Sequence, residues 1–97
     1  MTNAAFADKA VLTAAAARIS NYIHHTPLMS CATIDRICGC EIVFKCENFQ
    51  KAGAFKSRGA ANAVFSLLES GFRGSVATHS SGNHAQALSR VALHAGI

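Results

Sequence analysis

The chain has 97 residues, of which 51% are hydrophobic and only 14% are charged, and its formal net charge is +4. This length allows one small domain, and the apolar content excludes intrinsic disorder. Small domains need polar residues to cover their large relative surface, so we expect some apolar faces to lack their partner here. The basic residues are scattered between Lys9 and Arg90 without a basic stripe, which argues against nucleic acid as a partner.

The amino terminus and the cysteines indicate the compartment. Residues Met1 to Ala17 contain no basic region followed by a long apolar core, and no stretch reaches the apolar length of a membrane span. The chain has four cysteines, Cys31, Cys38, Cys40 and Cys46. They form no Cys-x-x-Cys pair, and Cys38-Gly39-Cys40 is too tight for the usual zinc spacing. We therefore predict reduced thiols, a cytoplasmic protein, no membrane partner and no metal site, and an unrelated small metal or thiol protein fits poorly.

The first half of the chain predicts two helices and a strand. Apolar residues recur at helical spacing on an alanine-rich background from about Asp8 to Asn21. Pro27 ends that helical region, because the residue before a proline is pushed towards extended conformations. A second, short helix is predicted over Ser30 to Cys38, with Gly39 at its C-cap. The apolar run that follows predicts a short buried strand near Ile42 to Cys46.

The second half continues the alternation of helices and strands. A third helix is predicted over Ser57 to Glu69, a second strand over Ser75 to Thr78, and a last amphipathic helix over Gly82 to Ala95. Alternation of this kind is typical of the α/β class.

Lys56 lies where a loop turns into the third helix. A helix start offers unpaired N–H groups and a partial positive charge. That field, a neighbouring cation such as Lys51 or Arg58, and partial burial beside Phe55 all favour the neutral amine of Lys56. A neutral amine is a nucleophile that forms a Schiff base with a carbonyl. A solvated surface charge is the commoner role of a lysine at a helix start, so the chemistry alone leaves both interpretations open.

A second candidate segment runs from Thr78 to Leu88, between the second strand and the last helix. Gly82 allows the backbone to approach a ligand closely, and the helix that follows points free N–H groups at it. Ser80, Ser81 and Asn83 add side-chain donors. The same residue types cap many helices, so an anion site and a simple N-cap both remain open for this segment.

Together the two segments carry a family resemblance. Gln-Lys-x-Gly-x-Phe-Lys-x-Arg-Gly-Ala, at residues 50–60, and Ser-Ser-Gly-Asn-His-x-Gln-Ala, at residues 80–87, follow each other here. They resemble the lysine segment and the substrate-carboxylate loop of the fold-type II pyridoxal-phosphate enzymes, within the serine racemase and serine-threonine dehydratase family. The resemblance runs from Phe6 to Ile97. It implies the tryptophan synthase β-like α/β fold, as a partial three-layer open sheet that ends after the first βα units. Residues 1–97 would then be the incomplete N-terminal part of a single, longer catalytic domain.

The resemblance also assigns roles to the site residues. By that resemblance, Lys56 holds pyridoxal 5'-phosphate as a Schiff base, Phe55 shapes the cofactor pocket, and Asn83 contacts the phenolic oxygen of the cofactor. The carboxylate of a small amino acid substrate would be bound by Ser80, Ser81, Gly82, Asn83 and His84. Ser81 occupies the position of the second acid/base of a racemase, on the face opposite Lys56, so Lys56 and Ser81 are the expected catalytic pair.

The implied activity has alternatives. Racemisation and β-elimination of serine or threonine are expected, and threonine dehydratase (threonine to 2-oxobutanoate and ammonia) is the alternative, because a dehydratase can use Lys56 alone. These residues contain no glycine cluster of the kind that cradles the cofactor phosphate, so we expect the isolated chain to be inactive. It could instead serve as a non-catalytic binding module on full-length subunits, which are expected to be homodimers.

The sequence contains little information on further ligands of a full-length enzyme. A divalent cation and ATP are allowed by the resemblance, but no residue pattern here identifies a cation site. The serines expected at the effector-nucleotide site are replaced by Cys31 and Ala32, which puts that site in doubt, whereas Lys51 is retained.

Overall fold

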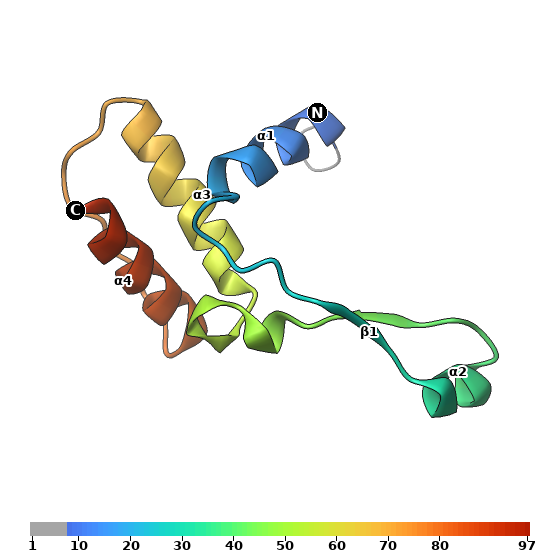
Figure 1. The fold of residues 1–97 in the computed structure, drawn as a ribbon. Helices are drawn as coiled ribbons and strands as arrows, with labels where there is room; N and C mark the ends of the chain where they lie inside the picture. The colour runs from blue at the N-terminus through green and yellow to red at the C-terminus, as the bar shows by residue number, and fades with distance from the viewer. Residues whose placement is uncertain (1–7) are drawn as a thin grey trace, which may run out of the picture.

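The computed structural model describes residues 8–97, and Phe6, where the family resemblance begins, lies outside them. In chain order the elements are α1 (Lys9–Ile19), β1 (Leu28–Ser30), α2 (Ala32–Cys38), β2 (Val43–Lys45), the short 3₁₀ turns η2 (Glu47–Phe49) and η3 (Lys51–Gly53), α3 (Lys56–Glu69) and α4 (Asn83–Ala95). Figure 1 shows α1, α3 and α4 grouped as a helical body, from which β1, α2 and β2 project to one side. The radius of gyration is 16.3 Å, larger than the roughly 13 Å of a compact domain of about 100 residues, as this projection requires.

The predicted helices are confirmed, with ends defined by their caps. Asp8 is the N-cap of α1, and its carboxylate accepts a hydrogen bond of 2.8 Å from the backbone N–H of Ala10. Gly39 ends α2 in the left-handed conformation, with φ of 67°, which is the C-cap role expected of it. Gly96 ends α4 in the same way, with φ of 75°.

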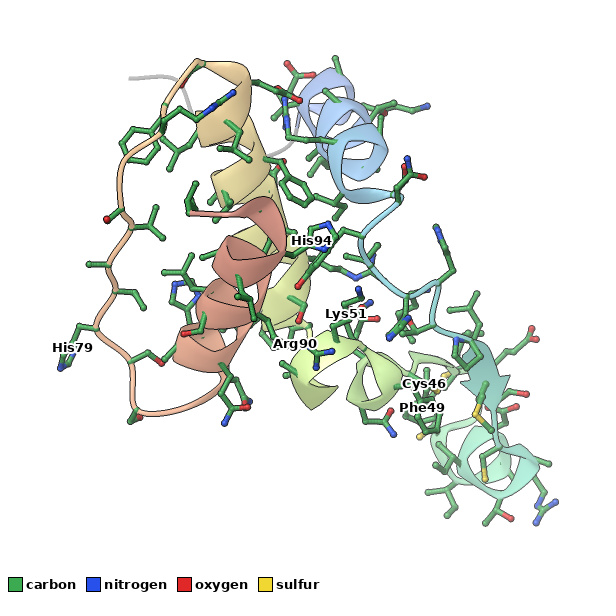
Figure 2. All side chains as sticks on the ribbon, turned by 60° about the vertical axis from the view of Figure 1, so that its left-hand side comes forward. Cys46, Phe49, Lys51, His79, Arg90 and His94 are labelled. Atoms are coloured by element: carbon green, nitrogen blue, oxygen red, sulfur yellow. The ribbon has the colours of Figure 1, made fainter. Side chains whose placement is uncertain are left out.

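The two strands form an antiparallel pair in which Leu28 lies opposite Lys45 and Ser30 opposite Val43. We call residues 28–45 the arm. Cys46 lies at the root of the arm (Figure 2), and its N–H donates a 3.0 Å hydrogen bond to the carbonyl of Pro27. The expectation that the strand near Ile42 to Cys46 is buried is wrong, because every strand residue is exposed. No layer of the described chain covers either face of this sheet.

The predicted strand over Ser75 to Thr78 is wrong as well. This segment makes no strand hydrogen bonds within the described chain, because the only paired strands there are β1 and β2. A strand is defined by its neighbour, and the apolar pattern of the segment cannot supply one. The segment instead runs beside α4, where Val76 and Ala77 line a shallow groove with Leu88 and Ala92.

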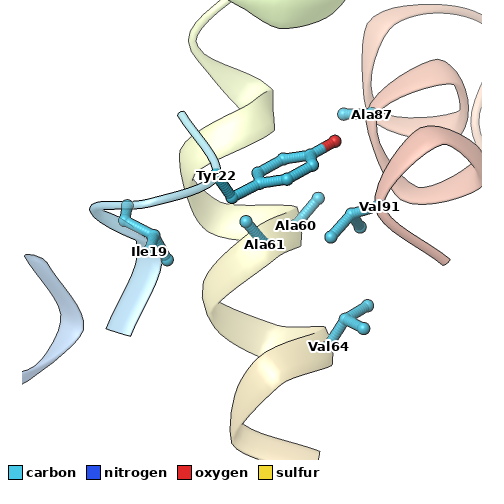
Figure 3. Close-up of a cluster of buried hydrophobic side chains, with 7 residues drawn as sticks. All are labelled: Ile19, Tyr22, Ala60, Ala61, Val64, Ala87 and Val91. Carbon is cyan, nitrogen blue, oxygen red and sulfur yellow. The ribbon is translucent and has the colours of Figure 1, made fainter. Parts of the chain in front are cut away.

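The core lies where the end of α1 meets α3 and α4. Its buried side chains, drawn in Figure 3, are Ile19, Tyr22, Ala60, Ala61, Val64, Ala87 and Val91. Alanines on both facing helices allow a close approach between α3 and α4. Figure 1 shows that these two helices run in the same direction, so both of their N-termini lie at the same end of the body. This packing places the start of α3 and the start of α4 next to one cavity.

Candidate functional site

An open cavity of about 740 Å³ lies at the shared end of α3 and α4. Its lining residues are Lys56, His79, Ser80, Ser81, Gly82, Asn83 and His84. The structure therefore brings together every site residue predicted from the sequence except Phe55, although Lys56 is separated by more than twenty positions from the rest of the set.

The N-terminus of α4 forms one wall of the cavity, and no described side chain caps it. Gly82 occupies the N-cap position, so the alternative of a Ser or Asn N-cap is not what the structure shows. The Ser80 hydroxyl accepts a 3.2 Å hydrogen bond from the N–H of Gly82, outside the helix. The helical hydrogen bonds begin with the N–H of Gln86, which donates to the carbonyl of Gly82 at 3.2 Å. The N–H groups of the first turn are thus directed at the cavity, in the arrangement that binds anions at helix starts.

Lys56 is the first residue of α3 and is exposed to the cavity. Its Nζ lies 5.1 Å from the centre of the Phe55 ring, and that ring is itself 61% exposed. The expectation that Lys56 is partly buried beside Phe55 is therefore wrong in the described chain. Both side chains are exposed among the described residues, and only Lys56 lines the cavity.

The two cations expected to influence Lys56 have other partners. The guanidinium of Arg58 pairs with the carboxylate of Glu47, with Nε to Oε1 at 2.5 Å and Nη2 to Oε2 at 3.0 Å. The Nζ of Lys51 lies 4.2 Å above the ring of Tyr22. Lys56 itself lies at the N-terminus of α3, the positive end of the helix dipole.

Glu47 forms a polar cluster that was not predicted. Besides Arg58, its carboxylate accepts a 2.5 Å hydrogen bond from the hydroxyl of Thr26, which is buried. The hydrogen bond from Arg58 lowers the pKa of Glu47 from its ordinary value to about 2, burial opposes this, and the Thr26 hydroxyl lowers it further. The carboxylate also raises the pKa of Arg58 by hydrogen bonding. In a chain with few charges, one carboxylate shortly before an arginine was the only signal in the sequence.

Gln50 holds the same region from another side. Its amide, in a side chain that is 4% exposed, accepts from the N–H of His24 at 2.9 Å and donates to the carbonyl of His24 at 2.8 Å. It also accepts from the N–H of Lys51 at 3.0 Å. The buried hydroxyl of Ser57 donates to the carbonyl of Lys51. The turns between β2 and α3 are thus fixed by side chains at both ends.

His79 also lines the cavity, although it lies outside the motif at residues 80–87 and no role was predicted for it. It lies on the segment that leads into α4 (Figure 2) and immediately precedes Ser80. Its position next to the recognised motif was the signal available.

Three further observations concern residues 8–97. No three His, Cys, Asp or Glu side chains in this range gather closely enough to hold a metal ion. None of the helices in this range has the length and apolar character needed to cross a membrane. Each of the four cysteines is a free thiol in the structure.

The chain is similar to proteins of known activity. Residues 19–97 match the family model described as pyridoxal-phosphate dependent enzyme. A serine racemase of Dictyostelium discoideum is 58% identical over 72 residues, which cover 74% of this chain and 22% of that protein. A beta-hydroxyaspartate dehydratase of Paracoccus denitrificans is 50% identical over 84 residues, which cover 87% of this chain and 27% of that protein.

Comparison with solved structures also finds a serine racemase. The solved structure of maize serine racemase aligns with a TM-score of 0.85 and 50% identity, over 94% of this chain and 29% of that one. This likeness confirms the predicted fold class. The chain spans about a quarter of the length of the curated relatives it matches.

Proposed function

The chain belongs to the pyridoxal-phosphate dependent enzyme family, and we propose that it supplies the lysine and the carboxylate loop of a serine racemase-like enzyme. The observation that carries the proposal is the shared cavity, in which the amine of Lys56 meets the uncapped N-terminus of α4. The activity proposed is that of a protein of the relatives' length, acting on serine or threonine.

The cavity residues fit pyridoxal phosphate. Its aldehyde requires a primary amine, and Lys56 presents one at the cavity without an ion-pair partner among the described residues. A volume of about 740 Å³ lies within the roughly 300–1,000 Å³ of small-molecule sites. We assign Asn83 to the phenolic oxygen and Phe55 to the border of the cofactor site. When bound, this cofactor supplies the electron sink that makes the Cα proton of an amino acid acidic.

The remaining residues have binding and proton-transfer roles. The first-turn N–H groups of α4, with Ser80, Ser81, Gly82, Asn83 and His84, would hold the substrate carboxylate. Lys56 would move the Cα proton on one face, and Ser81 would do so on the other. Racemisation needs both faces, whereas elimination of a β-hydroxyl group needs only that of Lys56.

Elimination is the second candidate function. The similarity to a beta-hydroxyaspartate dehydratase at 50% identity supports it, and Ser81 would then serve the carboxylate alone. A non-catalytic binding module on longer subunits is a third, supported by the exposed apolar side chains of the arm, such as Met29 and Phe44. The predicted homodimer and cytoplasmic location stay predictions.

Reductive trapping tests the proposal directly. Pyridoxal phosphate is added to an enzyme of the relatives' length that contains this sequence, the product is reduced with borohydride, and the labelled lysine is identified by peptide mapping. We expect the label on Lys56 and its loss in Lys56→Arg, while Lys9→Arg, on the exposed face of α1, serves as the matched control. Label on Lys45 or Lys51 in place of Lys56 would show that another amine reacts.

A further inference from the structure

We propose that Glu47 is a positioning residue for Lys56, because it fixes the first turn of α3 through Arg58. The inference rests on the proposed function, since it explains how the reactive amine is held in place.

The start of α3 has one other side-chain constraint, the hydrogen bond from the buried Ser57 hydroxyl to the carbonyl of Lys51. No described side chain caps the helix, and the first N–H to bond back, that of Ser57, reaches the carbonyl of Ala54 only at 3.5 Å. The side chain of Lys56 is exposed, and its one described contact is the neighbouring ring of Phe55. The position of the amine therefore depends on the backbone of this first turn.

Arg58 lies in that first turn, two residues after Lys56. Two of its guanidinium nitrogens contact the two oxygens of Glu47, at 2.5 and 3.0 Å. A bidentate contact of this kind sets the orientation of the helix start as well as its distance from the partner. The contact therefore limits how far the first turn can rotate.

Glu47 is itself held in place. It belongs to η2, directly after the arm, and it accepts the hydroxyl of the buried Thr26 at 2.5 Å. The side-chain amide of Gln50 ties the same turn to the backbone of His24, because it accepts from the His24 N–H and donates to the His24 carbonyl. One carboxylate thus joins the segment after α1, the turn after β2 and the start of α3.

The charge of this carboxylate persists under working conditions. The pKa of Glu47 is lowered to about 2, chiefly by the hydrogen bond from Arg58, so the pair is ionised at any pH at which the amine chemistry proceeds. A displacement of about 1 Å at a reacting group can cost roughly a hundredfold in rate. The loss of one ionic contact can therefore affect the reactivity of Lys56 without unfolding the protein.

The test compares the same substitution at the two ends of α3. Glu47→Gln removes the charge at the start of the helix, and Glu69→Gln removes it at the far end, where Glu69 pairs with Arg18 at 3.0 Å. Both substitutions are made in an enzyme of the relatives' length that contains this sequence. The proteins are treated with pyridoxal phosphate and borohydride, and the label on Lys56 is divided by that on Lys9. We expect this ratio to fall by about tenfold to a hundredfold in Glu47→Gln and to stay unchanged in Glu69→Gln. Glu47→Asp, which keeps the carboxylate, should recover part of the loss.

A second readout needs no cofactor. Amide hydrogen exchange of residues 57–59 should accelerate in Glu47→Gln at unchanged helix content, while the amides around Val91 keep their protection. If Glu47→Gln loses its helical circular dichroism, Arg58→Lys takes its place, since it keeps the cation but cannot make the bidentate contact.

The outcomes separate the two proposals. Equal labelling of Lys56 in the unchanged, Glu47→Gln and Glu69→Gln chains would overturn the role of Glu47 and leave the proposed function standing. Absence of label from Lys56 in the unchanged enzyme of the relatives' length would overturn the proposed function, and with it this inference.

Discussion

The ammonium group of Lys51 lies 4.2 Å from the centre of the Tyr22 ring, so the cation is held by the core and not by the site. Tyr22 is 5% exposed and contacts Phe65 edge-on at 5.6 Å, and burial raises the pKa of its hydroxyl. The pair fixes η3 to the end of α1.

Lys51 and Tyr22 should show a measurable coupling in the free energy of unfolding. Lys51→Met keeps most of the aliphatic stem but removes the cation, and it should lower the free energy of unfolding by about 0.5–1 kcal/mol. The loss should vanish when the same change is made in a Tyr22→Leu background. Urea unfolding of the four chains gives the coupling energy, and a loss that is equal in both backgrounds would show that the ring is not involved.

The free energy of unfolding at acid pH should depend on the ionisation of Glu47. Its pKa is lowered in the folded chain from an ordinary value of 4.5 to about 2, so the stability it adds is fully present above pH 4.5. That stability is lost as the pH falls from 4.5 towards 2. Its size should be on the order of 1–2 kcal/mol once solvent screening at the partly exposed Arg58 is considered.

The measurement is the free energy of unfolding as a function of pH. Glu47→Gln should flatten the curve between pH 4.5 and 2, whereas Glu41→Gln, at an exposed position, should leave it unchanged. A curve of the same shape in Glu47→Gln would assign the acid transition to other carboxylates.

Substitution of Ser81 should distinguish racemisation from elimination. In an enzyme that contains this sequence, Ser81→Ala should reduce racemisation of L- and D-serine by roughly 10²–10⁴-fold, since it removes the proposed acid/base of one face. Elimination from L-serine should persist, because the proposed base for that step is Lys56. Turnover of both enantiomers is the assay, and Ser80→Ala is the control that affects carboxylate binding alone. Small, equal losses in both reactions would indicate that Ser81 only binds the carboxylate.

Two glycines should respond to alanine in opposite directions. Gly39→Ala places a side chain at φ of 67° and should cost about 1 kcal/mol of stability. Gly59→Ala lies inside α3, where an added Cβ meets nothing within 4 Å, and should gain about 0.5–1 kcal/mol. Thermal unfolding of both variants tests this, and a loss at Gly59 would indicate that its small size serves a contact absent from the described chain.

The helices could be predicted because their signal is local. Apolar spacing and the glycine at residue 39 specify α1 to α4 to within two residues at each end, and the turn before α4 carries its donors within five consecutive positions. The strand at Ser75 to Thr78 could not be predicted reliably, since strand formation depends on a neighbouring strand. The prediction that Lys56 is partly buried was wrong for a similar reason, because the burial of a residue depends on which other segments cover it.

The side-chain contacts that hold the site could not be predicted from patterns in the sequence. Thr26, Glu47 and Arg58 meet only after the arm and the two 3₁₀ turns have folded, and no periodicity links them. His79 could have been selected only by extending the motif one residue towards the N-terminus. The features that could not be predicted are therefore contacts between residues far apart in the sequence and the shape of the cavity.

The arm leaves the helical body after Pro27 and returns at Cys46, and these two residues are hydrogen-bonded to each other. Topologically, residues 28–45 are therefore an insertion between two points that already touch. Antiparallel strands can be joined by a two-residue turn, so the whole excursion could be excised and the gap closed with a tight hairpin. The contacts of Thr26 and Gln50 would survive that shortening, leaving a minimal scaffold that displays Lys56 and the cavity-lining residues 79–84 alone.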